Sequence, residues 1–418
     1  MAGALKRYVE TYRAWGRNAR VLVITEPLWS VPMSWIFFYR PIYLRELAFS
    51  EAEIGLLYSI PLILQLFMPL LGGYLADRFG RKRTFMLFDA VGWLGAVLIW
   101  ASTSDRLLIA LAFVLEGLVS TIYAVWECLL VEDTGLEYRA SIYGVIQVIF
   151  LVGSLLTPLA GAVVDAFGVA PGFRTISWLA LASLVAMYAI RQVLLVEPPA
   201  TRLIEERGAS SYREVLGALA SDRRMLSIVA VNTLAGFMYP MAWAIPLYLT
   251  DERALGLDPG LASTFQTASA VPSIALLLTL TPRLAGGALA TAIRASYLAG
   301  AAGMALLAAA PHGAYCAALA ASALDSFRYV ASFALVRTYL NNSIDSVDPK
   351  LRAKLLSLAT TLSAVASLPA PAASGLCGWA QARAPPPRPA LPGVLPPNPL
   401  SWRQIDKHGH CRLMGVAL

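Results

Sequence analysis

Charged residues are scarce in this sequence: they make up 14% of its 418 residues, whereas hydrophobic residues make up 58%. Soluble domains carry roughly 25% charged residues, so the composition excludes an ordinary water-soluble domain. The few histidines and cysteines do not follow metal-ligand spacing, and no G-x4-G-K-[ST] phosphate loop occurs. These absences argue against an enzyme, against a metal or other cofactor, and against ATP as the source of energy.

What the sequence does contain is a series of long apolar segments separated by short charged loops. About 20 apolar residues cross the hydrocarbon core of a bilayer, and their backbone groups must pair within the segment, so each segment predicts a helix. The sequence therefore predicts an all-α membrane protein. The segments span 21–44, 51–76, 84–103, 106–131, 140–165, 174–195, 225–249, 259–281, 287–310, 312–340 and 352–379.

A charged, proline-containing stretch divides these segments into a group of six and a group of five. We expect an N-terminal leader, a first bundle of six helices, a linker, a second bundle with five visible helices, and a proline-rich polar tail. These parts cover residues 1–20, 21–195, 196–224, 225–379 and 380–418.

The two groups share features that predict an internal repeat. Ser50 and Glu53 form a capping-box pattern before the second segment, and Asp258-Pro259 supplies a cap and a first-turn proline before the eighth. Pro-x-Tyr-Leu precedes both places, at 41–44 and at 246–249. The pattern favours two pseudo-symmetric bundles.

The net charge of +7 comes from lysine and arginine concentrated in alternate loops. That distribution encodes membrane orientation, so it favours a multi-pass protein of the cell membrane over a nucleic-acid-binding protein. The N-terminus, the 78–83 turn and the linker lie on the richer side, which predicts a cytoplasmic N-terminus.

The end of the chain does not fit the repeat, because no twelfth apolar segment follows residue 379. Prolines as dense as those of 381–393 cannot form a spanning helix. One hypothesis is a change of reading frame near residue 375 that replaces the last helix. The alternative is a genuine disordered proline-rich tail.

The most specific motif is a glycine-broken basic hairpin, Gly-Tyr-Leu-Ala-Asp-Arg-Phe-Gly-Arg-Lys-Arg, at 73–83 between two apolar segments. It resembles the G-x-L-x-D-R-x-G-R-K/R signature of the major facilitator superfamily. The resemblance implies two six-helix bundles and a secondary transporter, expected to be a monomer, that moves a small molecule with protons or another coupling ion.

The same resemblance implies a gate on the cytoplasmic side. Asp77 would face the start of the eleventh helix near 350–354, and an arginine of the hairpin would pair with Glu132 or Asp133 at the end of the fourth. The residues expected to form this gate are Gly73, Asp77, Arg78, Gly80, Arg81, Arg83 and Asp133.

The fifth segment resembles the antiporter signature of the drug–proton branch, G-x8-G-x3-G-P-x2-G-G. Thr157 and Ala162 replace two of its glycines. Small residues allow close helix packing, and a proline removes a backbone hydrogen bond. The matching residues are Gly144, Gly153, Pro158 and Gly161.

The fourth segment departs from that branch: the expected arginine is absent, and Glu116 stands where glutamine is usual. Polar residues nevertheless form one-sided stripes on the first, fourth, seventh and tenth segments, which line the central cavity in this family. Intramembrane charges are costly and usually functional. The proton or substrate candidates are Glu26, Glu116, Tyr123, Glu127, Asn232, Asp325 and Arg328.

These carboxylates could instead form structural ion pairs, for example Glu116 or Glu127 with Arg328 or Arg40. Asp89, on the third segment, is expected to make a structural hydrogen bond. The preferred function is proton-coupled export of a small molecule. The alternatives are a proton-coupled importer of a sugar or organic anion, which Arg40 or Arg328 would bind, and a transport-dead or sensor-like membrane protein without its last helix.

Overall fold

The computed structural model describes residues 12–131, 133–197, 223–279, 287–336, 339 and 361–375. Every regular element in these ranges is helical, as the composition predicts. Six of the described helices are long and apolar enough to cross a membrane by length and composition. The predicted leader 1–20, the linker 196–224 and the tail 380–418 lie wholly or largely outside the described residues, as does any twelfth helix.

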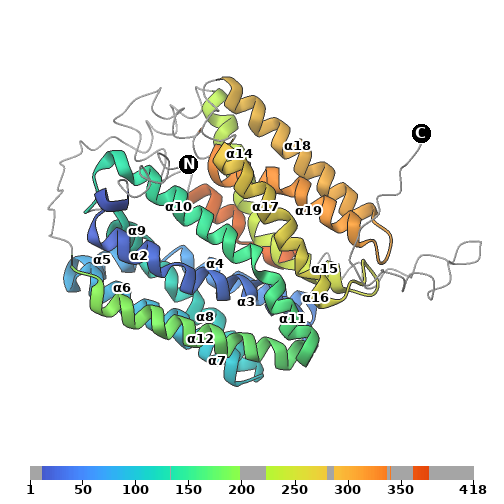
Figure 1. The fold of residues 1–418 in the computed structure, drawn as a ribbon, viewed down its shortest axis with the longest axis horizontal. Helices are drawn as coiled ribbons and strands as arrows, with labels where there is room; N and C mark the ends of the chain where they lie inside the picture. Colours follow the sequence, from blue (N-terminus) through green and yellow to red (C-terminus); the bar gives the residue numbers. More distant parts are fainter. Residues whose placement is uncertain are drawn as a thin grey trace, which may run out of the picture.

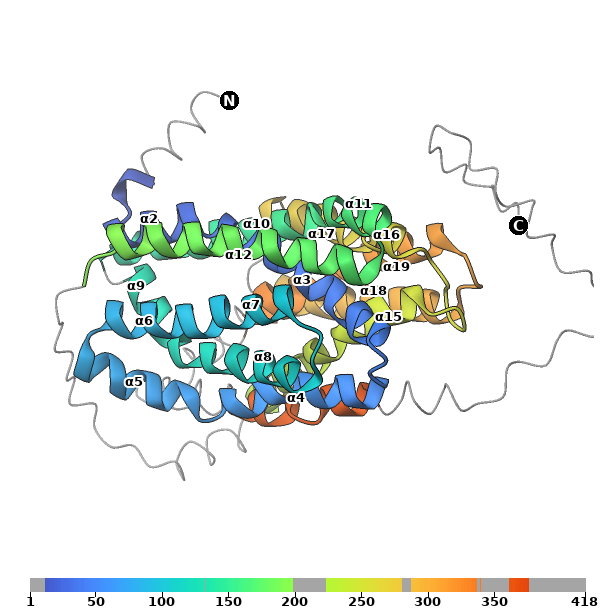
Figure 2. The same cartoon turned by 90° about the horizontal axis from the view of Figure 1, so that it is seen from below.

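The first bundle contains six rods, several of them built from two or three consecutive helices. They are α2 (Arg17–Thr25) with α3 (Pro27–Glu46); α4 (Glu51–Gln65) with α5 (Met68–Phe79); α6 (Arg81–Asp89), η1 (Ala90–Leu94) and α7 (Gly95–Ser102); α8 (Arg106–Leu118), η2 (Val119–Ile122) and α9 (Tyr123–Val131); α10 (Leu136–Leu155) with α11 (Thr157–Phe167); and α12 (Val169–Leu194). In Figure 2, α6 and α7 form one rod between α12 and α8, against both of which α7 packs.

The second bundle contains the seventh to tenth rods and the helical turns within 361–375. Its helices are α14 (Arg223–Met238), η3 (Tyr239–Ala244) and α15 (Ile245–Thr250); α16 (Pro259–Ala262) with α17 (Thr264–Thr279); α18 (Gly287–Ala309); and α19 (Tyr315–Val330) with η5 (Ala331–Leu335).

Both predicted start signals are present. The Ser50 hydroxyl accepts the backbone N–H of Glu53, and the Glu53 carboxylate accepts the backbone N–H of Ser50, so the capping box is complete. Asp258 accepts the N–H of Gly260, with Pro259 at the first helical position. Local chemistry therefore fixes the same boundary in both halves.

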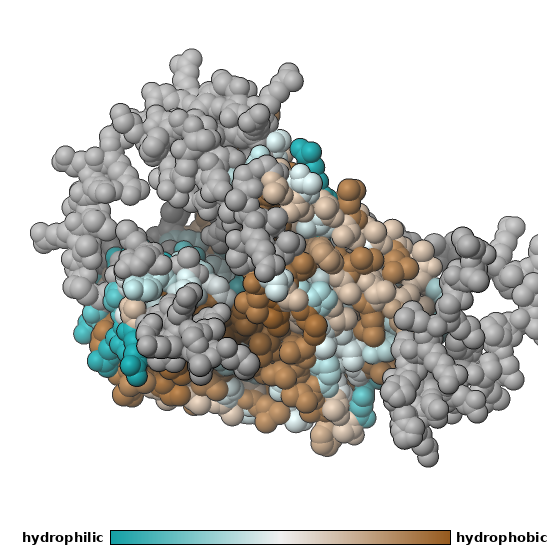
Figure 3. Space-filling view, turned by 45° about the horizontal axis from the view of Figure 1, so that its top comes forward, coloured by the Kyte–Doolittle hydropathy of each residue, from teal (hydrophilic) through white to brown (hydrophobic). Residues whose placement is uncertain are grey.

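The outer surface is apolar, as contact with lipid requires. Large side chains such as Leu107, Val193 and Leu298 are 81%, 75% and 72% exposed. On the face shown in Figure 3, apolar residues cover a broad area, and the most hydrophilic residues lie toward its edges. Exposed apolar surface of this extent is stable only against another apolar phase.

The bundles meet at one end of the molecule, which we call the Arg45 end. There α11 packs on α16, and α15 packs on α3. At the opposite end α5 and α6 of the first bundle lie far from α14 of the second (Figure 1). Together the described helices form two bundles joined at the Arg45 end and along α10 and α17.

Candidate functional site

Among the described residues, three ion pairs lie between or within helices at depths that the apolar segments assign to the membrane interior. They join Arg40 to Glu116, Arg191 to Glu26 and Arg328 to Asp325, with shortest N–O distances of 2.6, 2.8 and 2.5 Å. Each glutamate or aspartate of these pairs is at most 8% exposed. An uncompensated charge there would cost several kcal/mol, and pairing offsets part of that cost.

The Arg40–Glu116 pair is the most enclosed. One guanidinium nitrogen of Arg40 lies 2.6 Å from both carboxylate oxygens of Glu116, and Trp100 donates its indole N–H to the same carboxylate. Arg40 Nε donates to the Tyr58 hydroxyl at 3.0 Å. Of the alternatives for Glu116 that the sequence leaves open, pairing with Arg40 is the one present.

The aromatic rings around Arg40 link this pair to the second bundle. The guanidinium lies within 4.7–5.6 Å of four ring centres, a cation–π arrangement. One of these rings, Tyr58, stacks on Trp243 of η3 with centroids 5.2 Å apart. Three consecutive contacts therefore connect the Glu116 carboxylate to the second bundle: Glu116 with Arg40, Arg40 with Tyr58, and Tyr58 with Trp243.

Glu26 stands at the break between α2 and α3, and its partner Arg191 lies near the end of α12. Arg191 donates to the Glu26 carboxylate and, through Nε, to the Thr25 hydroxyl. A cavity of about 150 Å³ opens beside the pair, and Asp89 and Tyr123 line it too. The structural hydrogen bond expected for Asp89 is not among the contacts of the described residues.

The other predicted cavity residues occupy different settings. Asp325 and Arg328 of α19 pair with each other, as their spacing predicts, and Gly300 of α18 packs against Arg328. Glu127 on α9 is exposed, and Asn232 on α14 is half-buried. The backbone carbonyl oxygen of Asn232 accepts a hydrogen bond from the Ser363 hydroxyl. The structure therefore does not gather all seven candidates around one point.

The basic hairpin forms the expected tight turn. Gly80 adopts φ +92°, a conformation that side chains disfavour, between α5 and α6. Arg78 donates to the Tyr74 hydroxyl, and Arg83 is exposed. Several residues of the expected gate lie outside the described part of the structure: residues 350–354, Glu132 and the surroundings of Gly73 and of the Asp77 side chain. The gate therefore stays a prediction.

Two acidic side chains accept backbone N–H groups at helix starts, one at the hairpin and one at the start of α2. Glu197 accepts the backbone N–H groups of Arg81 and Lys82, at 2.5 and 2.9 Å, at the start of α6. The Asp133 carboxylate accepts the N–H of Asn18 at 2.8 Å, in the first turn of α2. Anions at helix N-termini are stabilising. No residue pattern in the sequence singles out Glu197.

Two of the three glycines in the motif of the fifth rod lie where another segment of the chain approaches closely. A Cβ on Gly153 would lie 2.6 Å from the Ser30 carbonyl oxygen, and one on Gly161 would lie 2.6 Å from Ser263 Oγ. Gly144 has no neighbour within 4 Å of its Cβ position. Pro158 stands at the start of α11, where α10 ends. Gly161 therefore permits close approach of the two bundles.

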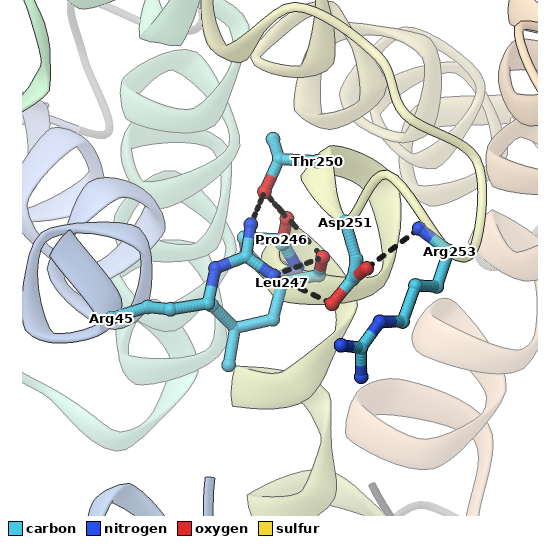
Figure 4. Close-up of polar contacts among 6 residues, drawn as sticks. All are labelled: Arg45, Pro246, Leu247, Thr250, Asp251 and Arg253. Atoms are coloured by element: carbon cyan, nitrogen blue, oxygen red, sulfur yellow. Dashed lines mark hydrogen bonds and ion pairs between the residues drawn. The ribbon is translucent and has the colours of Figure 1, made fainter. Parts of the chain in front are cut away.

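Polar contacts join the bundles at the Arg45 end (Figure 4). Arg45 of α3 pairs with Asp251 at 3.0 Å and donates to the Thr250 hydroxyl at 3.0 Å. Nearby, Tyr39 donates to the carbonyl of Pro259 at 3.0 Å. The Arg45 and Asp251 side chains are about one-third exposed, so water can reach this contact.

Comparison with known proteins agrees with this architecture. The family model described as Major Facilitator Superfamily matches residues 30–371. The chain belongs to this superfamily. It is therefore a multi-pass membrane protein of a family of secondary transporters, and the resemblance of its basic hairpin pointed to the right family.

Individual relatives are distant. A "Na(+), Li(+), K(+)/H(+) antiporter" of Planococcus maritimus is 26% identical over 265 residues, which cover 58% of this chain and only 61% of that protein. Two solved folds are similar. A bacterial homologue of the human lysosomal transporter Spinster, inward-facing and unoccupied, has a TM-score of 0.62 at 16% identity, covering 87% of this chain and 82% of that one. The nucleoside transporter NupG has a TM-score of 0.64 at 15% identity, covering 86% and 90%.

Proposed function

We propose that this superfamily member is a proton-coupled exporter of a small molecule that works by alternating access. In this proposal it resides in the cell membrane with its N-terminus in the cytoplasm. In this proposal the Arg45 end, where described helices of the two bundles make contact, faces away from the cytoplasm. The distant antiporter relative supports proton coupling.

The observation that carries the proposal is the buried Glu26–Arg191 pair beside a cavity. When a proton binds there, the carboxylate loses its own charge and its ion pair with Arg191, which provides a chemical step for coupling. The first rod is interrupted at Glu26, between α2 and α3. Binding of a proton to Glu26 therefore acts where the helix is already discontinuous.

The importer alternative has less support. In that alternative Arg40 or Arg328 would bind an anionic substrate, but each already pairs with a carboxylate, Glu116 and Asp325 respectively. An anion would have to displace a buried, hydrogen-bonded partner in either place. Export of a neutral or cationic solute needs no such displacement.

The test is flux through proteoliposomes that contain the purified full chain. With an imposed pH gradient, the unmodified protein should move a cationic dye against its concentration gradient, and Glu26→Gln should abolish that movement. Glu252→Gln, a change to an exposed carboxylate, serves as the matched control and should leave it intact. Undiminished dye movement in Glu26→Gln would contradict the assigned role.

A further inference from the structure

The cavity beside Glu26 lies inside the first bundle, with walls from five of its six rods. Its lining combines charged side chains with aromatic rings and two aliphatic residues. The residues are Glu26, Trp29, Phe85, Asp89, Trp93, Val119, Ile122, Tyr123, Trp126, Phe150 and Arg191. A volume of about 150 Å³ holds far more than one water molecule, which needs roughly 10–15 Å³ on the same measure.

The charges of the lining do not cancel. Glu26 and Arg191 neutralise each other, whereas Asp89 adds a negative charge. Asp89 is 3% exposed, and within the described ranges its carboxylate takes part in no hydrogen bond and no ion pair. It interacts with Arg191 and Glu26 only through space. With all three groups ionised, the cavity carries one uncompensated negative charge.

Aromatic rings form most of the remaining wall. Trp29 packs edge-on against Trp93, with centroids 5.2 Å apart, and against Phe150 at 5.7 Å. The faces of such rings attract cations that are weakly hydrated. Alkali and alkaline-earth metal ions instead require a shell of oxygen ligands, which a wall of indole and phenyl rings does not supply.

The helix backbones are irregular at the level of this cavity on three separate rods. The first rod breaks at Glu26, the π-helical segment η1 begins directly after Asp89, and the 3₁₀ segment η2 ends directly before Tyr123. Mid-helix π and 3₁₀ segments recur at functional sites, because they redirect side chains that a regular helix would aim elsewhere. The same three rods supply Glu26, Asp89 and Tyr123 to the cavity.

We propose that this cavity binds an organic ammonium ion, with the Asp89 carboxylate as counter-ion and the Trp29 and Trp93 rings around the cation. The inference rests on the proposed export function and deepens it. It places the substrate within the first bundle, and it identifies the substrate class as alkylammonium compounds.

The experiment measures equilibrium binding of choline to the purified full chain by calorimetry, without any gradient. The neutral isostere 3,3-dimethylbutan-1-ol has the same shape without the charge. We expect choline to bind at least about tenfold more tightly than the isostere, because a desolvated cation–π contact and a counter-ion act only on the charged probe.

Variants locate the site. Asp89→Asn keeps the shape of the side chain and should weaken choline binding about tenfold, whereas Asp89→Glu should retain most of it. Trp93→Leu should weaken binding about fivefold, and Glu252→Gln should not change it. Melting temperatures of all four variants establish that each is folded, and a folded Asp89→Asn variant that binds choline as tightly as the unmodified chain would overturn the proposal.

The outcome separates the two proposals. No binding of choline, or equal binding of choline and its isostere, overturns the ammonium site even if pH-driven flux of another solute is observed. Binding that depends on Asp89 supports the site even if no flux is found, in which case only the export function fails.

Discussion

At the scale of single residues, Arg40 has the most completely satisfied charge among those described. Its guanidinium holds Glu116 and Tyr58 and is surrounded by aromatic rings. Removal of one member of such a buried pair leaves the other charge desolvated, and this costs about 3–5 kcal/mol. Double replacement by apolar residues of similar size removes both charges together and can be neutral.

We therefore expect Glu116→Leu to lower the free energy of unfolding by about 3–5 kcal/mol and Arg40→Met combined with Glu116→Leu to recover most of that loss. The measurement is reversible denaturation in detergent. Arg106→Gln is the matched control, because its pair with Glu53 is about half exposed and should be worth less than about 1 kcal/mol. A double variant no more stable than the single one would show that the pair is not the source of the effect.

The individual site residues show where sequence reasoning stops. Stripes at helical spacing identified Glu26, Glu116 and Asp325, because a charge in an apolar segment stands out without any coordinates. Arg191, the partner of Glu26, lies 165 residues away and leaves no periodic signal. Arg40 is one of two candidate partners for Glu116 in the sequence, and only the structure chooses between them. The sequence predicts only a structural hydrogen bond for Asp89, because nothing in its neighbouring residues reveals the cavity that it lines.

At the scale of helices, the fifth rod shows that a sequence motif can combine positions of different importance. Its glycines look equivalent in the sequence, yet Gly153 and Gly161 face neighbours within 3 Å of a Cβ position, whereas Gly144 faces none within 4 Å. Interior packing cannot absorb such an overlap without a shift of backbone.

We predict that Gly144→Ala leaves the melting temperature within about a degree or raises it slightly, because alanine favours helix. Gly153→Ala should destabilise the protein by about 1–3 kcal/mol, since the added methyl group meets the Ser30 carbonyl. Thermal unfolding of the three purified proteins measures the difference. Equal melting temperatures for both variants would contradict the packing account.

Helix ends were more predictable than helix interiors. The capping box at Ser50 and the Asp258-Pro259 start depend on neighbours along the chain, so the sequence specifies them fully. The break at Glu26 does have one local signal, Pro27 directly after it. No local residue pattern indicates the π-helical η1 or the 3₁₀ segment η2.

At the scale of the whole molecule, the proposed alternating access requires two bundles that separate at one end while they approach at the other. The contact at the Arg45 end is suited to this, because its ion pair is partly hydrated and contributes about 1 kcal/mol or less. A weak gate allows both states to be populated, and small changes in it shift their ratio.

Loss of this contact should change the population without unfolding the protein. Arg45→Ala removes the pair with Asp251 and the bond to Thr250, and we expect it to favour the state that is open at the Arg45 end by about threefold to tenfold. Arg106→Gln, which alters an ion pair within the first bundle, is the control.

The most direct test is a pair of spin-label distance measurements by electron paramagnetic resonance on the full chain in lipid. One pair, at Glu46 and Glu252, spans the Arg45 end, and the other, at Phe79 and Leu226, spans the opposite end. We predict that Arg45→Ala lengthens the distance between the labels at 46 and 252 and shortens the distance between those at 79 and 226. Distances that stay fixed, or that lengthen together, would contradict alternating access in this protein.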